Sequence, residues 1–115
     1  MGPFSRTTTD LDPKQAQRLV AEEGAMLLDV REPDEWAAGH APEAVHMPLG
    51  QLDLSAIPQD RVVVTVCRSG GRSGRAAQAL QSAGIDARNL AGGMTAWSGA
   101  GLPVRRDDGS TGIVI

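Results

Sequence analysis

Apolar and polar residues alternate in blocks along this chain, and the blocks predict strands and helices in turn. Residues 62–66 form a continuous run of valine and threonine, which is typical of a strand covered on both faces. Weaker apolar runs predict further strands at 25–30, 44–47 and 87–90. Apolar positions at helical spacing, bounded by Pro or Gly, predict helices at 14–23, 33–39, 73–83 and 93–97. The alternation predicts an α/β fold, with a central parallel β-sheet flanked by α-helices on both faces.

Length and composition are those of one globular domain. Of the 115 residues 41% are hydrophobic and only 3% are aromatic, so the core must rest on aliphatic side chains. We assign the domain to residues 10–104, because the predicted elements lie there. Residues 1–9 are expected to form an N-terminal extension, and the mostly polar residues 105–115 a flexible C-terminal tail.

Charge and hydropathy argue against two classes of function. The net charge of -3 gives the molecule no basic field, which disfavours nucleic-acid binding. The sequence has no apolar stretch approaching the ~20 residues that a membrane-spanning helix needs, so no membrane association is expected. A single cysteine cannot form an intramolecular disulfide, which suits a reducing compartment, and we expect a cytoplasmic location.

The single cysteine, Cys67, is the candidate for chemistry. It follows the predicted strand at 62–66 and begins a loop that continues as Arg68, Ser69, Gly70, Gly71, Arg72 and Ser73. A free thiol with a pKa of about 8.5 is only ~3% ionised at pH 7, so a nucleophilic cysteine needs its anion stabilised. Glycines let backbone N–H groups turn toward an anion, the following helix adds a positive dipole, and the arginines add charge. The loop therefore predicts a reactive thiolate that needs no histidine base.

Other polar and aromatic residues have simpler interpretations. Asp29 and Arg31 lie two residues apart at the end of a predicted strand, so their side chains point to the same side. We interpret them as an ion pair that supports the site. His46 has no partner that the sequence suggests, and we expect neither a metal nor a cofactor. Trp36 and Trp97 are interpreted as packing residues.

Three segments resemble the motifs of rhodanese domains. The first is Leu28–Trp36 followed by Gly39–Ala44, the second is Cys67–Ser73, and the third is Leu90–Trp97 with Gly101–Val104 behind it. Their order and spacing match the family over the whole predicted domain. The resemblance implies a single-domain rhodanese-like fold.

The resemblance also implies a sulfurtransferase that carries sulfur as a cysteine persulfide. By the family's motif Cys67 is the nucleophile, while Arg68, Arg72 and the amides of residues 69–73 hold an anionic donor. The basic loop resembles the branch of the family that uses thiosulfate, which implies thiosulfate as the donor. The resemblance also implies cyanide, a thiol or a protein as the acceptor. His40 belongs to the family's Gly-His signature, and we interpret it as a hydrogen-bonded supporting residue.

Two other functions are alternatives to a thiosulfate sulfurtransferase. Phosphatases and arsenate reductases of the related fold generally place five residues between cysteine and arginine, whereas four separate Cys67 from Arg72. The smaller loop fits a single terminal sulfur better than a tetrahedral oxyanion. A binding or persulfide-relay module with little turnover of its own stays open, and fast transfer to a partner would favour it.

Overall fold

The computed structural model describes residues 10–115 and contains a four-stranded parallel sheet in the order β2-β1-β3-β4. The strands are β1 (Met26–Asp29), β2 (Val45–His46), β3 (Val63–Val66) and β4 (Ala87–Asn89). Each lies inside a segment for which the hydrophobic pattern predicts a strand. The extension expected at 1–9 lies outside the described residues.

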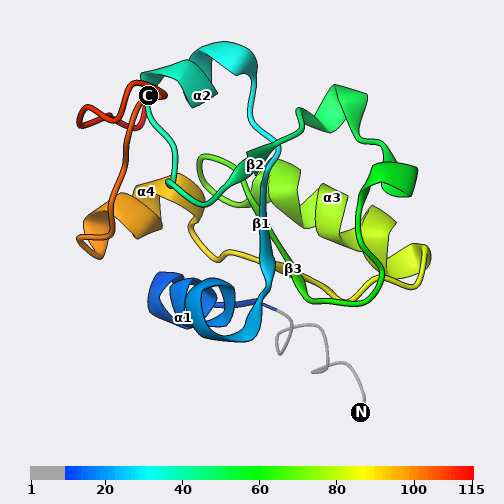
Figure 1. Ribbon diagram of the computed structural model, residues 1–115. Helices are drawn as coiled ribbons and strands as arrows, with labels where there is room; N and C mark the ends of the chain where they lie inside the picture. The colour runs from blue at the N-terminus through cyan, green and yellow to red at the C-terminus, as the bar shows by residue number, and fades with distance from the viewer. Residues whose placement is uncertain (1–9) are drawn as a thin grey trace.

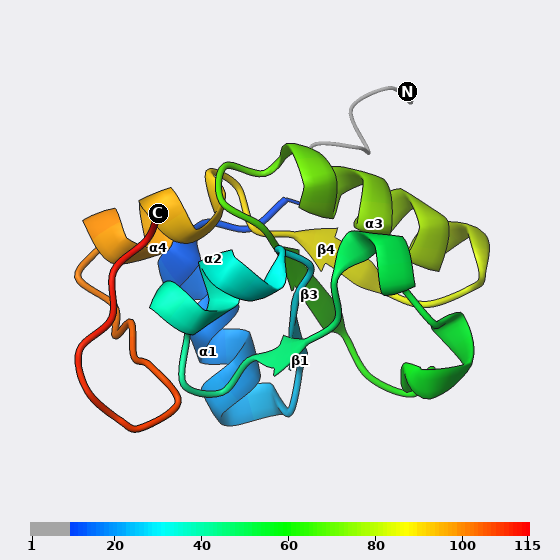
Figure 2. The same ribbon diagram turned by 90° about the horizontal axis from the view of Figure 1, so that it is seen from above.

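Helices cover both faces of the sheet. They are α1 (Pro13–Glu23), α2 (Pro33–Ala38), α3 (Gly71–Ser82) and α4 (Gly93–Gly99), with short 3-10 turns η2 (Leu49–Gln51) and η3 (Leu54–Ala56). Figures 1 and 2 show α1 and α4 on one face, α3 on the other, and α2 above the end of β1. The α/β fold with a flanked parallel sheet is therefore confirmed. Within residues 10–115 no helix is both long and apolar enough to cross a membrane.

The alternating direction of side chains along the strands divides the core into two clusters. In β1, Leu27 packs in the cluster formed with α1 and α4, whereas Leu28 packs in the cluster formed with α3. The same alternation continues past the end of β3, where Val66 belongs to the first cluster and Cys67 to the second. The sulfur therefore lies on the face of the sheet where α3 begins.

The start of α3 differs from the prediction. The helix begins at Gly71, earlier than the predicted position 73, because Gly70 serves as its N-cap. Gly70 has a φ of 112°, a left-handed conformation that glycine adopts without strain. Arg72 and Ser73 consequently lie in the first turn of the helix, where their side-chain directions are set by the helical backbone.

Residues 105–115, expected to form a flexible tail, make backbone contacts with the domain. Arg105 and His40 exchange two backbone hydrogen bonds of 2.8 Å, and the Ile113 N–H donates to the Ala38 carbonyl at 2.9 Å. Between these points the polar residues close a turn with hydrogen bonds among themselves. The segment thus packs beside the end of α2, as Figure 1 shows. Its polar residues form a local turn that stays in contact with the domain.

Candidate active site

Cys67 lies directly after β3, at the carboxyl edge of the sheet. From the central pair β1 and β3 the chain runs outward to β2 on one side and to β4 on the other. In parallel α/β sheets the crevice at such a reversal of strand order is the usual ligand site. Cys67 itself is buried, with a relative exposure of 1%.

Hydrogen-bond donors surround the sulfur. The backbone N–H of Gly70 donates to Sγ at 3.1 Å, and Oγ of Ser73 lies 3.3 Å from it. Burial by itself raises the pKa of Cys67, but the hydroxyl and amide of Ser73 and the amides of Gly70 and Ser69 outweigh it. The net pKa of the thiol is lowered, so this environment favours the thiolate.

The start of α4 holds the beginning of the cysteine loop from the other side. Backbone N–H groups of Met94 and Thr95 donate to the carbonyls of Cys67 and Arg68, at 2.7 and 3.0 Å. Gly93 has a φ of 58°, and a Cβ at this position would overlap the Cys67 carbonyl oxygen. Gly93 of the third motif therefore allows two backbone segments to touch.

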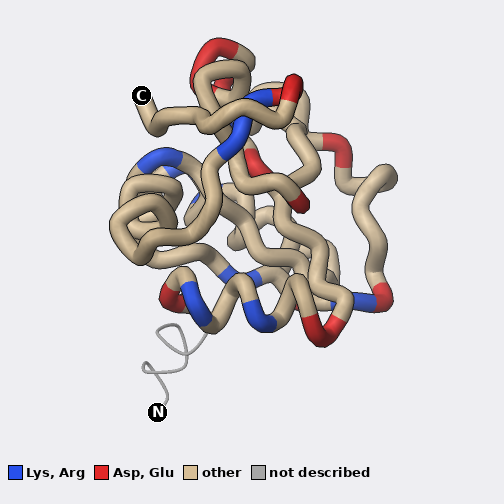
Figure 3. The backbone as a smooth tube through the Cα atoms, turned by 60° about the vertical axis from the view of Figure 1, so that its left-hand side comes forward, with Lys and Arg blue, Asp and Glu red and all other residues tan. Residues whose placement is uncertain are grey.

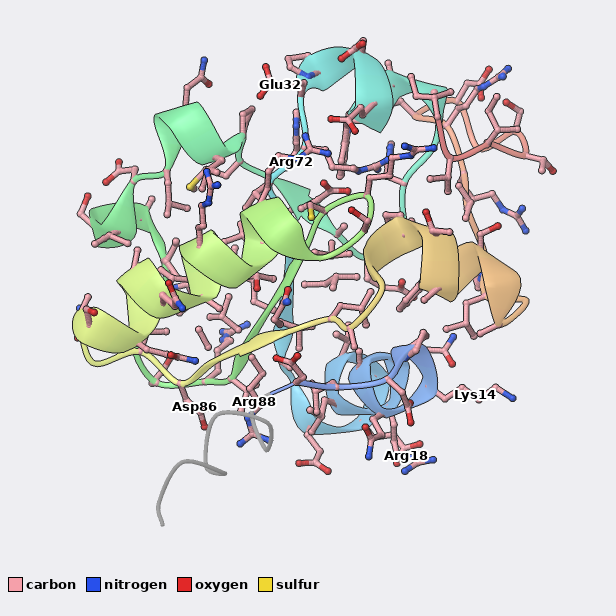
Figure 4. The ribbon with its side chains drawn as sticks, turned by 180° about the vertical axis from the view of Figure 1, so that it is seen from behind. Lys14, Arg18, Glu32, Arg72, Asp86 and Arg88 are labelled. Carbon is pink, nitrogen blue, oxygen red and sulfur yellow. The ribbon has the colours of Figure 1, made fainter. Side chains whose placement is uncertain are left out.

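Arg68 and Arg72, the expected donor-binding residues, have different surroundings. Arg72 makes a bidentate pair with Glu35, with distances of 2.6 and 2.9 Å, whereas Arg68 is exposed. Figure 4 shows Arg72 at the start of α3, on the side of the segment that carries Glu32. The hydrogen bond from Arg72 is the main cause that lowers the pKa of Glu35 to about 2. The largest causes that lower the pKa of Cys67 are hydrogen bonds from loop hydroxyl and amide groups.

Asp29 and Arg31 form the ion pair that their spacing predicts. Nη2 of Arg31 lies 2.8 Å from Oδ2 of Asp29, and both side chains are completely buried. The same Nη2 donates to the carbonyl of Gly39 at 2.8 Å. The pair therefore connects the end of β1 to the end of α2 and makes these contacts outside the cysteine loop.

His40 and His46 both stack on Trp36. The ring centroids are 3.5 Å apart for His40 and 4.7 Å apart for His46, with nearly parallel planes. Nδ1 of His40 lies 2.8 Å from the Trp36 carbonyl, its Nε2 lies 3.2 Å from Asp107, and Nε2 of His46 lies 2.7 Å from the Arg31 carbonyl. His40 is thus hydrogen bonded near the end of α2, and His46 has a partner that the sequence did not indicate.

Two residues of the site were missed in the sequence. Glu35 pairs with Arg72, although the sequence indicated only that it lies within the helix predicted at 33–39. Asn89 accepts a hydrogen bond from Ser73 at 2.6 Å and donates to the Gly70 carbonyl at 3.1 Å. The only feature of the sequence that could have indicated Asn89 is its polar side chain near the end of a predicted strand.

The surface carries no single sign of charge over the part of the chain that the structure describes. Figure 3 shows Lys and Arg positions interspersed with Asp and Glu positions along the backbone. Among residues 10–115 no group of three or more His, Cys, Asp or Glu side chains is arranged to hold a metal ion. The groups gathered at Cys67 are hydrogen-bond donors and one ion pair.

Residues 12–100 match the rhodanese-like domain family. The match covers most of the chain and includes the first two motifs, the third motif as far as Trp97, the sheet and the cysteine loop. This chain therefore belongs to the rhodanese-like family.

Similar proteins include named sulfurtransferases. A sulfurtransferase of Allochromatium vinosum is 41% identical over 97 residues, covering 82% of this chain and 91% of that protein. The thiosulfate sulfurtransferase GlpE of Actinobacillus pleuropneumoniae is 33% identical over 105 residues, covering 88% and 96%. An uncharacterised protein of Synechocystis is 40% identical over 106 residues, 90% of this chain, and the match spans only 59% of its length.

A solved structure has the same fold. The crystal structure of a rhodanese-related protein from Thermoplasma volcanium superimposes with a TM-score of 0.77 at 25% identity. The superposition covers 83% of this chain and 95% of that one. The parallel sheet and its flanking helices are therefore an arrangement shared with an experimentally determined relative.

Proposed function

We propose that this chain is a thiosulfate sulfurtransferase that carries sulfur as a persulfide on Cys67. The environment of the sulfur carries the proposal, since an N–H and a hydroxyl lie 3.1 and 3.3 Å from a buried Sγ. Donors at these distances stabilise an anion in a site that excludes water. The relatives named sulfurtransferase and thiosulfate sulfurtransferase support the same reaction class and the same donor.

The reaction has two half-steps. The Cys67 thiolate attacks the outer sulfur of thiosulfate, a new S–S bond forms, and sulfite leaves with the electron pair of the broken bond. Cyanide or an acceptor thiolate then attacks the terminal sulfur of the persulfide. The S–S bond breaks, and its electron pair returns to Cys67 as the thiolate. Each nucleophile enters as an anion, so neither half-step requires a proton transfer.

The two arginines would serve the donor in different ways. Thiosulfate is a dianion, and a guanidinium matches such an anion well. Arg72 is 35% exposed, so the donor can reach it, but its pair with Glu35 must open or be shared. Arg68 is exposed. A cytoplasmic location belongs to the same proposal, because a reducing compartment keeps the Cys67 thiol free.

Mass spectrometry of the intact protein tests this mechanism directly. After incubation with thiosulfate and desalting, we expect the mass to rise by one sulfur atom and to return on addition of cyanide. The Cys67→Ser variant has the same shape but no thiol, and should gain nothing. Absence of the added sulfur in the wild type, or its presence in Cys67→Ser, would overturn the proposal.

The same protein preparation separates the alternatives. Slow turnover with thiosulfate, together with rapid loss of the added sulfur to a protein thiol, would indicate a relay module. Hydrolysis of a phosphate ester that is lost in Cys67→Ser would instead indicate a phosphatase.

A further inference from the structure

The hydroxyl of Ser73 has more acceptors around it than it has protons. Its Oγ lies 2.6 Å from Oδ1 of Asn89, 3.3 Å from Sγ of Cys67 and 3.4 Å from the Gly70 carbonyl. A hydroxyl donates one proton, and 2.6 Å is at the short end of the range for an O–H···O bond. In this arrangement the proton therefore points to Asn89 and away from the sulfur.

The orientation of the Asn89 amide is fixed by its other contact. Nδ2 of Asn89 lies 3.1 Å from the Gly70 carbonyl oxygen, which can only accept. Turning the amide over would place two oxygen atoms against each other. Oδ1 must then face Ser73, so Asn89 can only receive the hydroxyl proton and cannot supply one to it.

The protonation state of Cys67 decides whether this arrangement holds. A protonated thiol can donate weakly to the lone pairs of Ser73 Oγ, so the hydroxyl can stay on Asn89. A thiolate can only accept, and it draws the hydroxyl proton away from Asn89. In a persulfide the negative charge lies on the terminal sulfur, the inner Sγ becomes a weak acceptor, and the hydroxyl returns to Asn89.

We propose that Asn89 is a positioning residue that acts on Cys67 through Ser73, competing with the sulfur for one hydroxyl proton. The return of the hydroxyl to Asn89 in the persulfide rests on the proposed function, whereas the competition in the free enzyme does not. Among the described residues the charged groups near this edge are Arg68, which follows Cys67 in the chain, and two ion pairs. The buried pair is Asp29 with Arg31, and the other is Arg72, which interacts with Cys67 through its charge, with Glu35. None of these charged groups is hydrogen bonded to the Ser73 hydroxyl, so they do not take part in the competition.

The pH dependence of Cys67 alkylation by iodoacetamide tests this competition. Asn89→Ala removes the competing acceptor, so we expect the pH midpoint to fall by about one unit, the size of one charge-assisted hydrogen bond. Ser73→Ala removes the donor and should raise the midpoint. In the double variant the Asn89 substitution should have no further effect. The proposal would be overturned if Asn89→Ala shifted the alkylation midpoint equally with and without the Ser73 hydroxyl. It would also be overturned if Asn89→Ala raised the midpoint.

Two further variants separate this role from a general loosening of the loop. Thr65→Val removes the 2.9 Å hydrogen bond from Oγ1 of Thr65 to the Ser73 carbonyl, and leaves the acceptors of the hydroxyl in place. Its alkylation midpoint should match the wild type. Asn89→Val keeps bulk beside Gly70 and suits a strand, so it repeats the test if Asn89→Ala does not fold. A shift in Thr65→Val equal to that in Asn89→Ala would also overturn the proposal.

The alkylation assay contains no sulfur donor, so it is independent of the mass measurement. If the effect of Asn89→Ala on the alkylation midpoint depends on Ser73, but no persulfide forms, the proposed function is refuted and the competition for the proton stands. If a persulfide forms, but the effect of Asn89→Ala does not depend on Ser73, the competition is refuted and the proposed function stands.

Discussion

Two ion pairs lie at the carboxyl end of the sheet, and they differ in their exposure to water. Asp29 and Arg31 are two residues apart at the end of β1, and both side chains are 0% exposed. Glu35 and Arg72 connect α2 to α3, and their side chains are 14% and 35% exposed. The first pair is sealed inside the domain, whereas solvent and a dissolved anion can reach the second.

This difference assigns the two pairs to different tasks. A charge sealed in the interior must keep its partner, because an unpaired charge there loses its hydration without compensation. A partly exposed pair contributes only about 0–1 kcal/mol, so opening it costs the fold no more than that. The Asp29–Arg31 pair therefore holds the end of α2, while the Glu35–Arg72 pair sets how much positive charge is available beside Cys67.

The largest effect is expected from breaking the buried pair. Asp29→Asn keeps the shape of the side chain but leaves the charge of Arg31 unpaired, so the free energy of unfolding should fall by about 3–5 kcal/mol. Urea denaturation followed by circular dichroism measures the change. The matched control is Asp86→Asn, because Asp86 is 57% exposed in its pair with Arg88. Equal losses in the two variants would show that burial does not distinguish these pairs.

A smaller effect on stability, with a visible effect on activity, is expected from opening the exposed pair. Glu35→Gln removes the charge that competes with the donor for Arg72. The KM for thiosulfate should fall by about two- to fivefold, which corresponds to the free energy of a half-exposed pair. The free energy of unfolding should change by no more than about 1 kcal/mol. Steady-state kinetics with cyanide as the acceptor gives the KM.

The control for this variant is Asp34→Asn, on the same helix. Asp34 is an exposed acidic residue in the first turn of α2, next to Glu35 in the sequence. Its substitution removes one negative charge from the same neighbourhood without touching the pair. If Asp34→Asn lowers the KM as much as Glu35→Gln, the effect is one of net charge and not of the release of Arg72.

The smallest expected effect is the pH dependence of the contribution that the Glu35–Arg72 pair makes to the free energy of unfolding. The pKa of Glu35 is about 2 in the folded protein and 4.5 without the pair, so the pair stabilises the fold above pH 4.5. This contribution is lost as the pH falls toward about 2. The wild type should therefore exceed Glu35→Gln in stability by at most about 1 kcal/mol at neutral pH and by less at about pH 3. Urea unfolding of both proteins at the two pH values checks this. A constant difference would mean that the carboxylate does not act through its charge.

Much of this architecture follows from local patterns in the sequence. The run at 62–66 predicts a buried strand because β-branched residues pack well on both faces of a sheet. The glycines after Cys67 predict a loop of inward-facing amides, and Gly70 does donate its N–H to the sulfur. Asp29 and Arg31 were paired correctly because a strand places alternate residues on one side.

The parts that were missed depend on contacts between distant segments. Glu35 and Arg72 belong to different helices and meet only after the sheet has brought those helices together. Asn89 lies on β4 and contacts Ser73 in the first turn of α3, and no pattern in either segment indicates this contact. The residues after Arg105 looked like a tail, because their polar character does not reveal that backbone groups near His40 would pair with them.

The close approach at Gly93 limits how a protein of this design can diversify. On that side the wall of the cysteine loop is made of main chain, whose chemistry is the same whatever the sequence, and a side chain at residue 93 would displace it. Side chains of the same loop that solvent can reach have more room to vary, since Arg68 and Ser69 are exposed and Arg72 is partly so. Changes at that outer rim can therefore alter which donors or acceptors are selected without disturbing the backbone contact at Gly93.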